Sequence, residues 1–117
     1  MSTVFEFPRV PAGVQVHADT ADASQQIAAF LAKHPGLQEI LTEGLEHFHQ
    51  AFPESDRFTI ALETDPESSD WAYVVVSVQT ALPVPEAHDR MNAFTWGWLQ
   101  EHTAQLGDTV LFDVEYA

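Results

Sequence analysis

Apolar residues follow a helical period most clearly between residues 37 and 52. They recur there every three or four positions, which places them on one face of an α-helix; they are Leu37, Ile40, Leu41, Leu45, Phe48 and Phe52. Gly44 lies within this face, where a glycine leaves room for another backbone to come close. Pro53 ends the pattern. We therefore predict a helix over 37–52 that supplies much of the hydrophobic core.

A shorter helical pattern precedes this one. Asp22, followed three residues later by Gln25, forms a capping pair at its start. The helix is expected to end by Lys33, because Pro35 disfavours helical geometry in His34. His34 and Pro35 then serve as the N-cap and the first residue of the next helix.

Alternation of apolar and polar residues predicts strands over residues 58–62 and 110–116, and a run rich in β-branched residues predicts a further strand over 71–80. A turn-rich loop joins strands 58–62 and 71–80, which should form an antiparallel hairpin.

A third helix begins at Pro83 and Pro85. Its apolar face consists of Ala87, Met91, Phe94 and Trp98. A right-handed crossover through this helix would place the last strand parallel to strand 71–80. That strand is apolar on both faces, so we expect it to be central and partly covered on both.

The first 19 residues are predicted to form an irregular arm with one edge strand, because Pro8 and Pro11 interrupt its apolar residues. The order of elements is then (β)-α-α-β-β-α-β. We predict a single α+β domain over 1–117, with an antiparallel-rich sheet of three or four strands and helices mainly on one face.

Composition narrows the possible functions. Of 117 residues, 18 are Asp or Glu and 4 are Lys or Arg, which gives a net charge of −14. Such a balance argues against direct nucleic-acid binding and against docking on anionic membranes. The absence of cysteine excludes disulfides and thiol chemistry. No signal peptide and no apolar run of about 20 residues is present, so we expect a cytoplasmic protein that does not contact membranes.

Four short motifs from His34 onward give the chain a resemblance. They are His34-Pro35-Gly36-Leu37, Ala51-Phe52-Pro53, Asp65-Pro66-Glu67 and Trp98-Leu99. With these motifs the chain resembles a small family of uncharacterised bacterial proteins. That family tends to carry acids just before the tryptophan of its last helix, where this chain has Thr95, Trp96 and Gly97. The resemblance implies an α+β fold and no particular activity.

Two histidines flank Phe48 in the predicted helix 37–52. In a helix, residues two apart lie about 200° apart around the axis, so His47 and His49 do not share a metal ion without further ligands. We interpret them as polar residues beside an apolar stripe. Glu43 is four residues from His47 and would form a weak pair with it.

The remaining candidates for metal or acid–base chemistry lie further along the chain. Asp65, Glu67 and Asp70 cluster in the hairpin loop, where they suit weak calcium or magnesium binding or a solvated turn. The loop lacks the glycine and the distal glutamate of a calcium-binding loop. His88 and Asp89 are neighbours on a helix and do not face each other. We therefore predict no catalytic residue, no metal site and no cofactor.

Trp96 is an aromatic residue on a polar helical face. Asp89, Asn92 and Gln100 are its neighbours on the helical wheel, and an exposed aromatic in such a setting is typical of an interface hot spot. Alternatively, the N-terminal arm with its phenylalanines folds over it.

Three functional hypotheses remain. The favoured one is a non-enzymatic module that binds another protein, or itself as a homodimer, through Trp96 and the acidic edge of the sheet. The second is a small metal-dependent or acid–base enzyme that uses His47, His49, His88 or the loop carboxylates. The third is an acidic mimic of DNA that inhibits a nucleic-acid-binding protein by charge complementarity.

Overall fold

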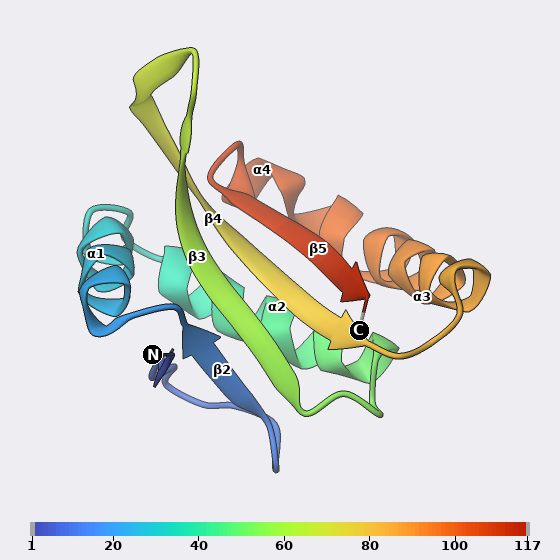
Figure 1. Cartoon of the computed structure of the whole chain (residues 1–117). Coiled ribbons are helices and arrows are strands. Elements are labelled where there is room, and N and C mark those ends of the chain that lie inside the picture. The colour runs from blue at the N-terminus through green and yellow to red at the C-terminus, as the bar shows by residue number, and fades with distance from the viewer. Residues whose placement is uncertain (1, 117) are drawn as a thin grey trace.

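The structure is a computed structural model that describes the backbone of residues 2–116 and the side chains of 2–67 and 71–116. In these residues, four helices and a 3-10 turn lie against one face of a five-stranded sheet (Figure 1). In chain order the elements are β1 (Thr3–Val4), β2 (Gln15–Ala18), α1 (Ala21–Ala32), α2 (Leu37–Ala51), β3 (Arg57–Asp65), β4 (Ser68–Thr80), α3 (Val84–Gly97), η1 (Leu99–His102), α4 (Thr103–Leu106) and β5 (Val110–Tyr116).

The strands lie in the order β1-β2-β3-β4-β5. Two neighbouring pairs are antiparallel, β1–β2 and β3–β4. The other two pairs, β2–β3 and β4–β5, are parallel. The α+β class, the hairpin and the parallel last strand are confirmed. The predicted antiparallel-rich sheet of three or four strands is wrong, because the sheet is mixed and has five strands. Helical crossovers connect β2 to β3 and β4 to β5, and such connections favour parallel pairs.

The N-terminal arm contributes two strands rather than one. β1 is the edge strand, and β2 lies inside the sheet between β1 and β3. Pro8 and Pro11 lie between these two strands and interrupt the arm there, as expected. β2 begins after Pro11, so neither proline disrupts it. Phe5 and Phe7 between the strands are buried, and their ring centroids lie 5.2 Å apart.

Two helix starts differ from the prediction. Thr20, not Asp22, caps α1, since the N–H of Ala23 donates to Thr20 Oγ1 over 3.0 Å. α2 begins at Leu37 after Gly36, whose φ of 86° is left-handed and favours glycine. His34 and Pro35 therefore belong to the turn before α2. The predicted end of the first helix near Lys33 is confirmed.

The core lies between the helices and the sheet. Phe48 of α2 lies at its centre. Its ring centroid is 4.8 to 5.7 Å from the centroids of four other phenylalanine rings, those of Phe52, Phe58, Phe94 and Phe112. At Gly44 an added Cβ would lie 2.8 Å from a ring carbon of Trp98 and 2.9 Å from one of Phe112. The glycine therefore makes room for two aromatic rings rather than for a backbone.

The second face of the sheet carries no helix among the described residues; it is turned to the viewer in Figure 1. We call it the bare face. The sequence predicts partial cover of β4 on both faces, and on this face Tyr73 and Val75 are half-buried and Ser77 is 5% exposed, between neighbouring strands rather than under a helix. β4 carries apolar side chains on both faces, but only the face of Val74, Val76 and Val78 packs against the helices.

Candidate functional site

The bare face carries a row of apolar side chains. Successive residues of a strand point to opposite faces, and the strand register places Ala61, Val75 and Leu111 side by side across β3, β4 and β5. We call these three residues the apolar row. Leu111 has 51% of its surface exposed, whereas the other two are half-buried by their neighbours. The apolar row therefore forms a continuous apolar surface that faces water.

Two aromatic residues extend the apolar row toward the β3–β4 hairpin. Tyr73 is half-buried and lies opposite Glu63. Trp71 is 44% exposed, and its indole N–H donates to the carbonyl oxygen of Asp108 over 3.3 Å. That bond ties the start of β4 to the turn before β5. It holds the Trp71 ring in one orientation while part of the ring stays accessible.

Beyond the apolar row, toward the C-terminal end of β5, the bare face becomes polar. Thr59, Ser77 and Asp113 form the next row, and after them come Arg57, Gln79 and Glu115. The two β5 acids are exposed. The face is thus divided into an apolar half and a polar half whose β5 side is acidic.

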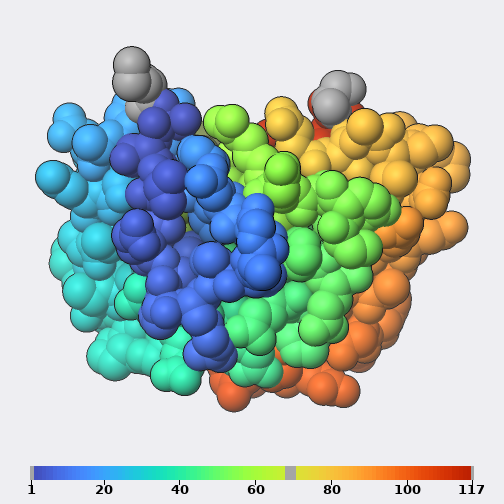
Figure 2. Space-filling model, turned by 90° about the horizontal axis from the view of Figure 1, so that it is seen from below, coloured from blue at the N-terminus to red at the C-terminus, as the bar shows by residue number. Residues whose placement is uncertain are grey.

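Trp96 is exposed, as an interface residue would be. It has 66% of its surface accessible, and its side chain makes no hydrogen bond or ring contact with another described residue. Asp89, Asn92 and Gln100 are exposed as well, the first two on α3 and Gln100 in η1. The alternative, in which the N-terminal arm covers Trp96, is wrong. The dark blue arm in Figure 2 lies apart from the orange α3, and Phe5 borders a hollow formed with α1.

The histidines of α2 have separate aromatic neighbours. His47 stacks on Trp98 at 5.7 Å between ring centroids, and His49 meets the edge of Phe58 at 6.2 Å. The structure therefore places them as the sequence suggested, beside the apolar stripe. His88 and Asp89 are exposed on α3.

A polar cluster surrounds Trp98, and no motif in the sequence points to it. The indole N–H of Trp98 donates to Glu43 Oε1 over 3.2 Å, and the His102 ring stacks on the indole at 4.3 Å. His102 Nε2 lies 3.8 Å from the same carboxylate oxygen. The cluster fastens η1 to α2. Glu43 and Trp98 are 55 residues apart, so no local spacing could have revealed it.

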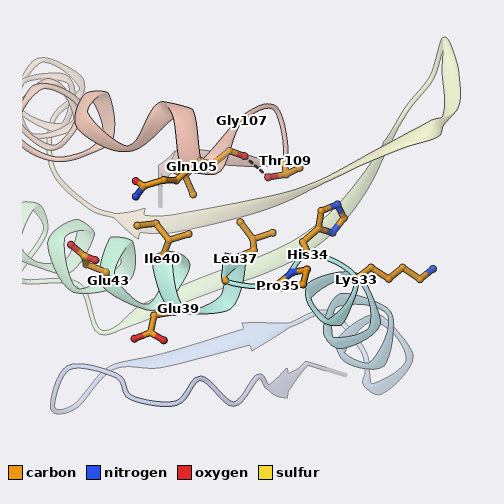
Figure 3. A pocket seen from close by; sticks show the side chains of 12 residues that line it. Lys33, His34, Pro35, Leu37, Glu39, Ile40, Glu43, Gln105, Gly107 and Thr109 are labelled. Carbon is orange, nitrogen blue, oxygen red and sulfur yellow. Dashed lines mark hydrogen bonds between the residues drawn. The ribbon is translucent and has the colours of Figure 1, made fainter.

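A groove of about 830 Å³ lies between the start of α2 and the segment from α4 to β5. Figure 3 shows Leu37 and Ile40 pointing toward that segment, whereas Glu39 and Lys33 point away. His34 is bound to the end of α1, because its Nδ1 lies 2.9 Å from the carbonyl oxygen of Phe30. The charged side chains of the groove do not converge on one point, and the arrangement offers no acid–base pair.

The hairpin loop forms a turn. Asp65 Oδ1 accepts a hydrogen bond of 2.8 Å from the N–H of Glu67. The side chain of Asp70, the third candidate ligand, lies outside the described residues. Within the described part of the chain, no three His, Asp or Glu residues are grouped so that they could hold a metal ion.

The acids of α2 bear on the DNA-mimic hypothesis. Glu46 forms an ion pair of 2.6 Å with Arg9, and Glu43 binds Trp98 as described. Glu39 is exposed, whereas Glu43 and Glu46 are half-buried. The helix therefore presents no row of free carboxylates resembling a phosphate backbone.

No family model, curated protein or solved structure matches the chain. The resemblance drawn from the short motifs stays a prediction. None of the helices in the described residues has the length and hydrophobicity to cross a lipid bilayer.

Proposed function

We propose that this protein is a non-enzymatic binding module that uses the bare face of its sheet to bind another protein. The apolar row carries the proposal. On the solvated face of an open sheet the alternating residues are usually polar, and here three neighbouring strands contribute apolar side chains in register. Exposed apolar patches with polar rims are typical of interaction sites.

Charge indicates what kind of partner would fit. Asp113 and Glu115 border the apolar row on β5, and Glu63 lies on the same face of β3. Arg57 is the one Lys or Arg among the described residues of this face. The whole chain carries a net charge of −14. Charge complementarity therefore favours a basic protein over a second acidic copy at this surface.

Trp96 supports a separate proposal. It lies in the helical layer on α3, so it belongs to a different surface from the bare face. With Asp89, Asn92 and Gln100 it remains our candidate for self-association into a homodimer.

Site-specific photo-cross-linking in the native cells tests the bare face. A benzophenone amino acid at position 111 or 75 is expected to capture one basic protein. The same amino acid at position 84 is the control, because Val84 is 61% exposed but lies on α3. Leu111→Asp should abolish capture from position 75. Equal capture at 84, or no capture at 75 and 111, would contradict the proposal.

A further inference from the structure

β5 forms an unpaired edge of the sheet. The opposite edge, β1, has two residues and is soon followed by Pro8, whereas β5 has seven residues. Among the described residues, no backbone hydrogen bond joins β5 to any element other than β4. A long edge strand presents free N–H and C=O groups to which another strand can add.

The register identifies these free groups. The N–H of Val74 donates to the carbonyl oxygen of Thr109, and residues of a parallel ladder alternate in direction. Odd-numbered residues of β5 therefore face β4. The even-numbered residues direct their N–H and C=O groups outward, and they are Val110, Phe112, Val114 and Tyr116.

Few of the usual protections of an edge strand are present. β5 contains no proline and no lysine, and its register with β4 runs without a bulge from Val110 to Tyr116. Asp113 and Glu115 are its only charges. These carboxylates repel acidic strands, including β5 of a second copy, but they attract basic ones.

The side chains on the two faces of β5 determine which side chains an added strand should carry. On the bare face the strand would lie beside Leu111, which suits an apolar residue, and beside Asp113 and Glu115, which suit Lys or Arg. On the helical face it would lie beside Val110 and Val114, which are half-buried, and Tyr116, which is 50% exposed. Apolar side chains suit these positions. The two requirements alternate along the strand, as side chains of a strand do.

We propose that β5 accepts an extended segment of the partner protein, with alternating basic and apolar residues, as a sixth strand of the sheet. This inference rests on the proposed function, because it names how the partner would bind beside the bare face. Backbone hydrogen bonds would supply affinity, and the alternating side chains would supply specificity.

A ten-residue peptide of alternating Lys and Val provides the probe. Binding to the full chain is measured by titration of backbone amide NMR signals. We expect the largest shifts in β5 and weaker binding at high salt. A peptide of alternating Glu and Val should not bind. A Lys and Val peptide in which two valines are replaced by proline should also fail, because proline cannot complete the ladder.

Two variants locate the site. Val114→Pro removes one outward N–H and leaves the ladder to β4 intact, and we expect it to weaken peptide binding by about tenfold or more. The double variant Asp113→Asn, Glu115→Gln changes only exposed side chains, and we expect a loss of about three- to tenfold. The control double variant Asp19→Asn, Glu101→Gln changes the net charge equally at exposed positions away from β5 and should bind normally.

The results separate this inference from the proposed function. If neither β5 variant weakens binding, or if the acidic peptide binds equally well, strand addition is overturned. A wild-type dimer that Val114→Pro converts to a monomer would overturn the basic partner, since the edge would then pair with itself. If positions 75 and 111 cross-link a protein but the peptide does not bind, the bare face would remain the proposed binding surface, and strand addition at β5 would be refuted.

Discussion

Phe112 and Leu111 are neighbours on β5, yet they meet opposite environments. Phe112 faces the helices and is 5% exposed, whereas Leu111 faces water and is 51% exposed. Both residues are strongly apolar, but only Phe112 is buried in the core. The difference shows that the helical face of the sheet accounts for stability. The apolar residues of the bare face are free for contact with another molecule.

The largest expected effect comes from the helical face. Phe112→Ala should lower the free energy of unfolding by about 3–5 kcal/mol, because it removes a buried ring that contacts Phe48, Phe94 and Trp98. Urea unfolding followed by circular dichroism measures the change. A loss below about 1 kcal/mol would show that this ring is not part of a packed core.

A smaller loss is expected at Gly44. In Gly44→Ala the new methyl group would press on the rings of Trp98 and Phe112. Overpacking costs about 1–3 kcal/mol, which the better helix propensity of alanine offsets by up to about 1 kcal/mol. Gly97→Ala is the matched control on α3, because no atom outside its chain neighbours and the nearby backbone of its own helix lies within 4 Å of the added Cβ. Gly97→Ala should be neutral or stabilising in the same unfolding experiment, and equal losses at both sites would contradict the packing described.

Trp96→Ala should affect association rather than folding. With 66% of its surface exposed, the residue contributes little to the core, and the free energy of unfolding should change by less than about 0.5 kcal/mol. Sedimentation velocity is expected to show weaker self-association than in the wild type. A monomer in both forms would remove Trp96 from the candidate contacts.

The smallest effect on stability is expected at the bare face. Leu111→Thr should change the free energy of unfolding by no more than about 0.5 kcal/mol, because a β-branched polar residue suits an exposed strand position. A loss comparable to that of Phe112→Ala in the same urea titration would mean that the two faces do not differ as described.

The periodic elements of the fold could be predicted from the sequence, and its pairings only in part. The stripe from Leu37 to Phe52 and the alternation from Val110 to Tyr116 are local signals, so the helix and the strand were found. β2 has only four residues and depends on its pairing with β3, which no local pattern reveals. The five-stranded sheet was missed for this reason.

The candidate site was less predictable than the fold. The helical wheel places Trp96 on a polar face, but it leaves open whether the N-terminal arm covers the residue, and only the structure shows that it is exposed. The sequence shows that the second face of β4 is apolar, but it does not show that no helix packs there, because a sequence pattern cannot tell a face packed against helices from one that lacks them. The apolar row depends on the register of three strands, and the contact between Glu43 and Trp98 spans 55 residues. Both arise only when the chain folds.

The three tryptophans allow a direct test of the bare face as a binding surface. Trp71 lies on the bare face with 44% exposure, Trp96 is exposed on α3, and Trp98 is 3% exposed in the core. Hydroxyl-radical oxidation, read by mass spectrometry, compares the purified protein with the protein in its native cells. We predict that Trp71 is oxidised in the purified protein and protected in cells, relative to Trp96, while Trp98 is protected in both. Equal oxidation of Trp71 in both settings would contradict a partner on the bare face.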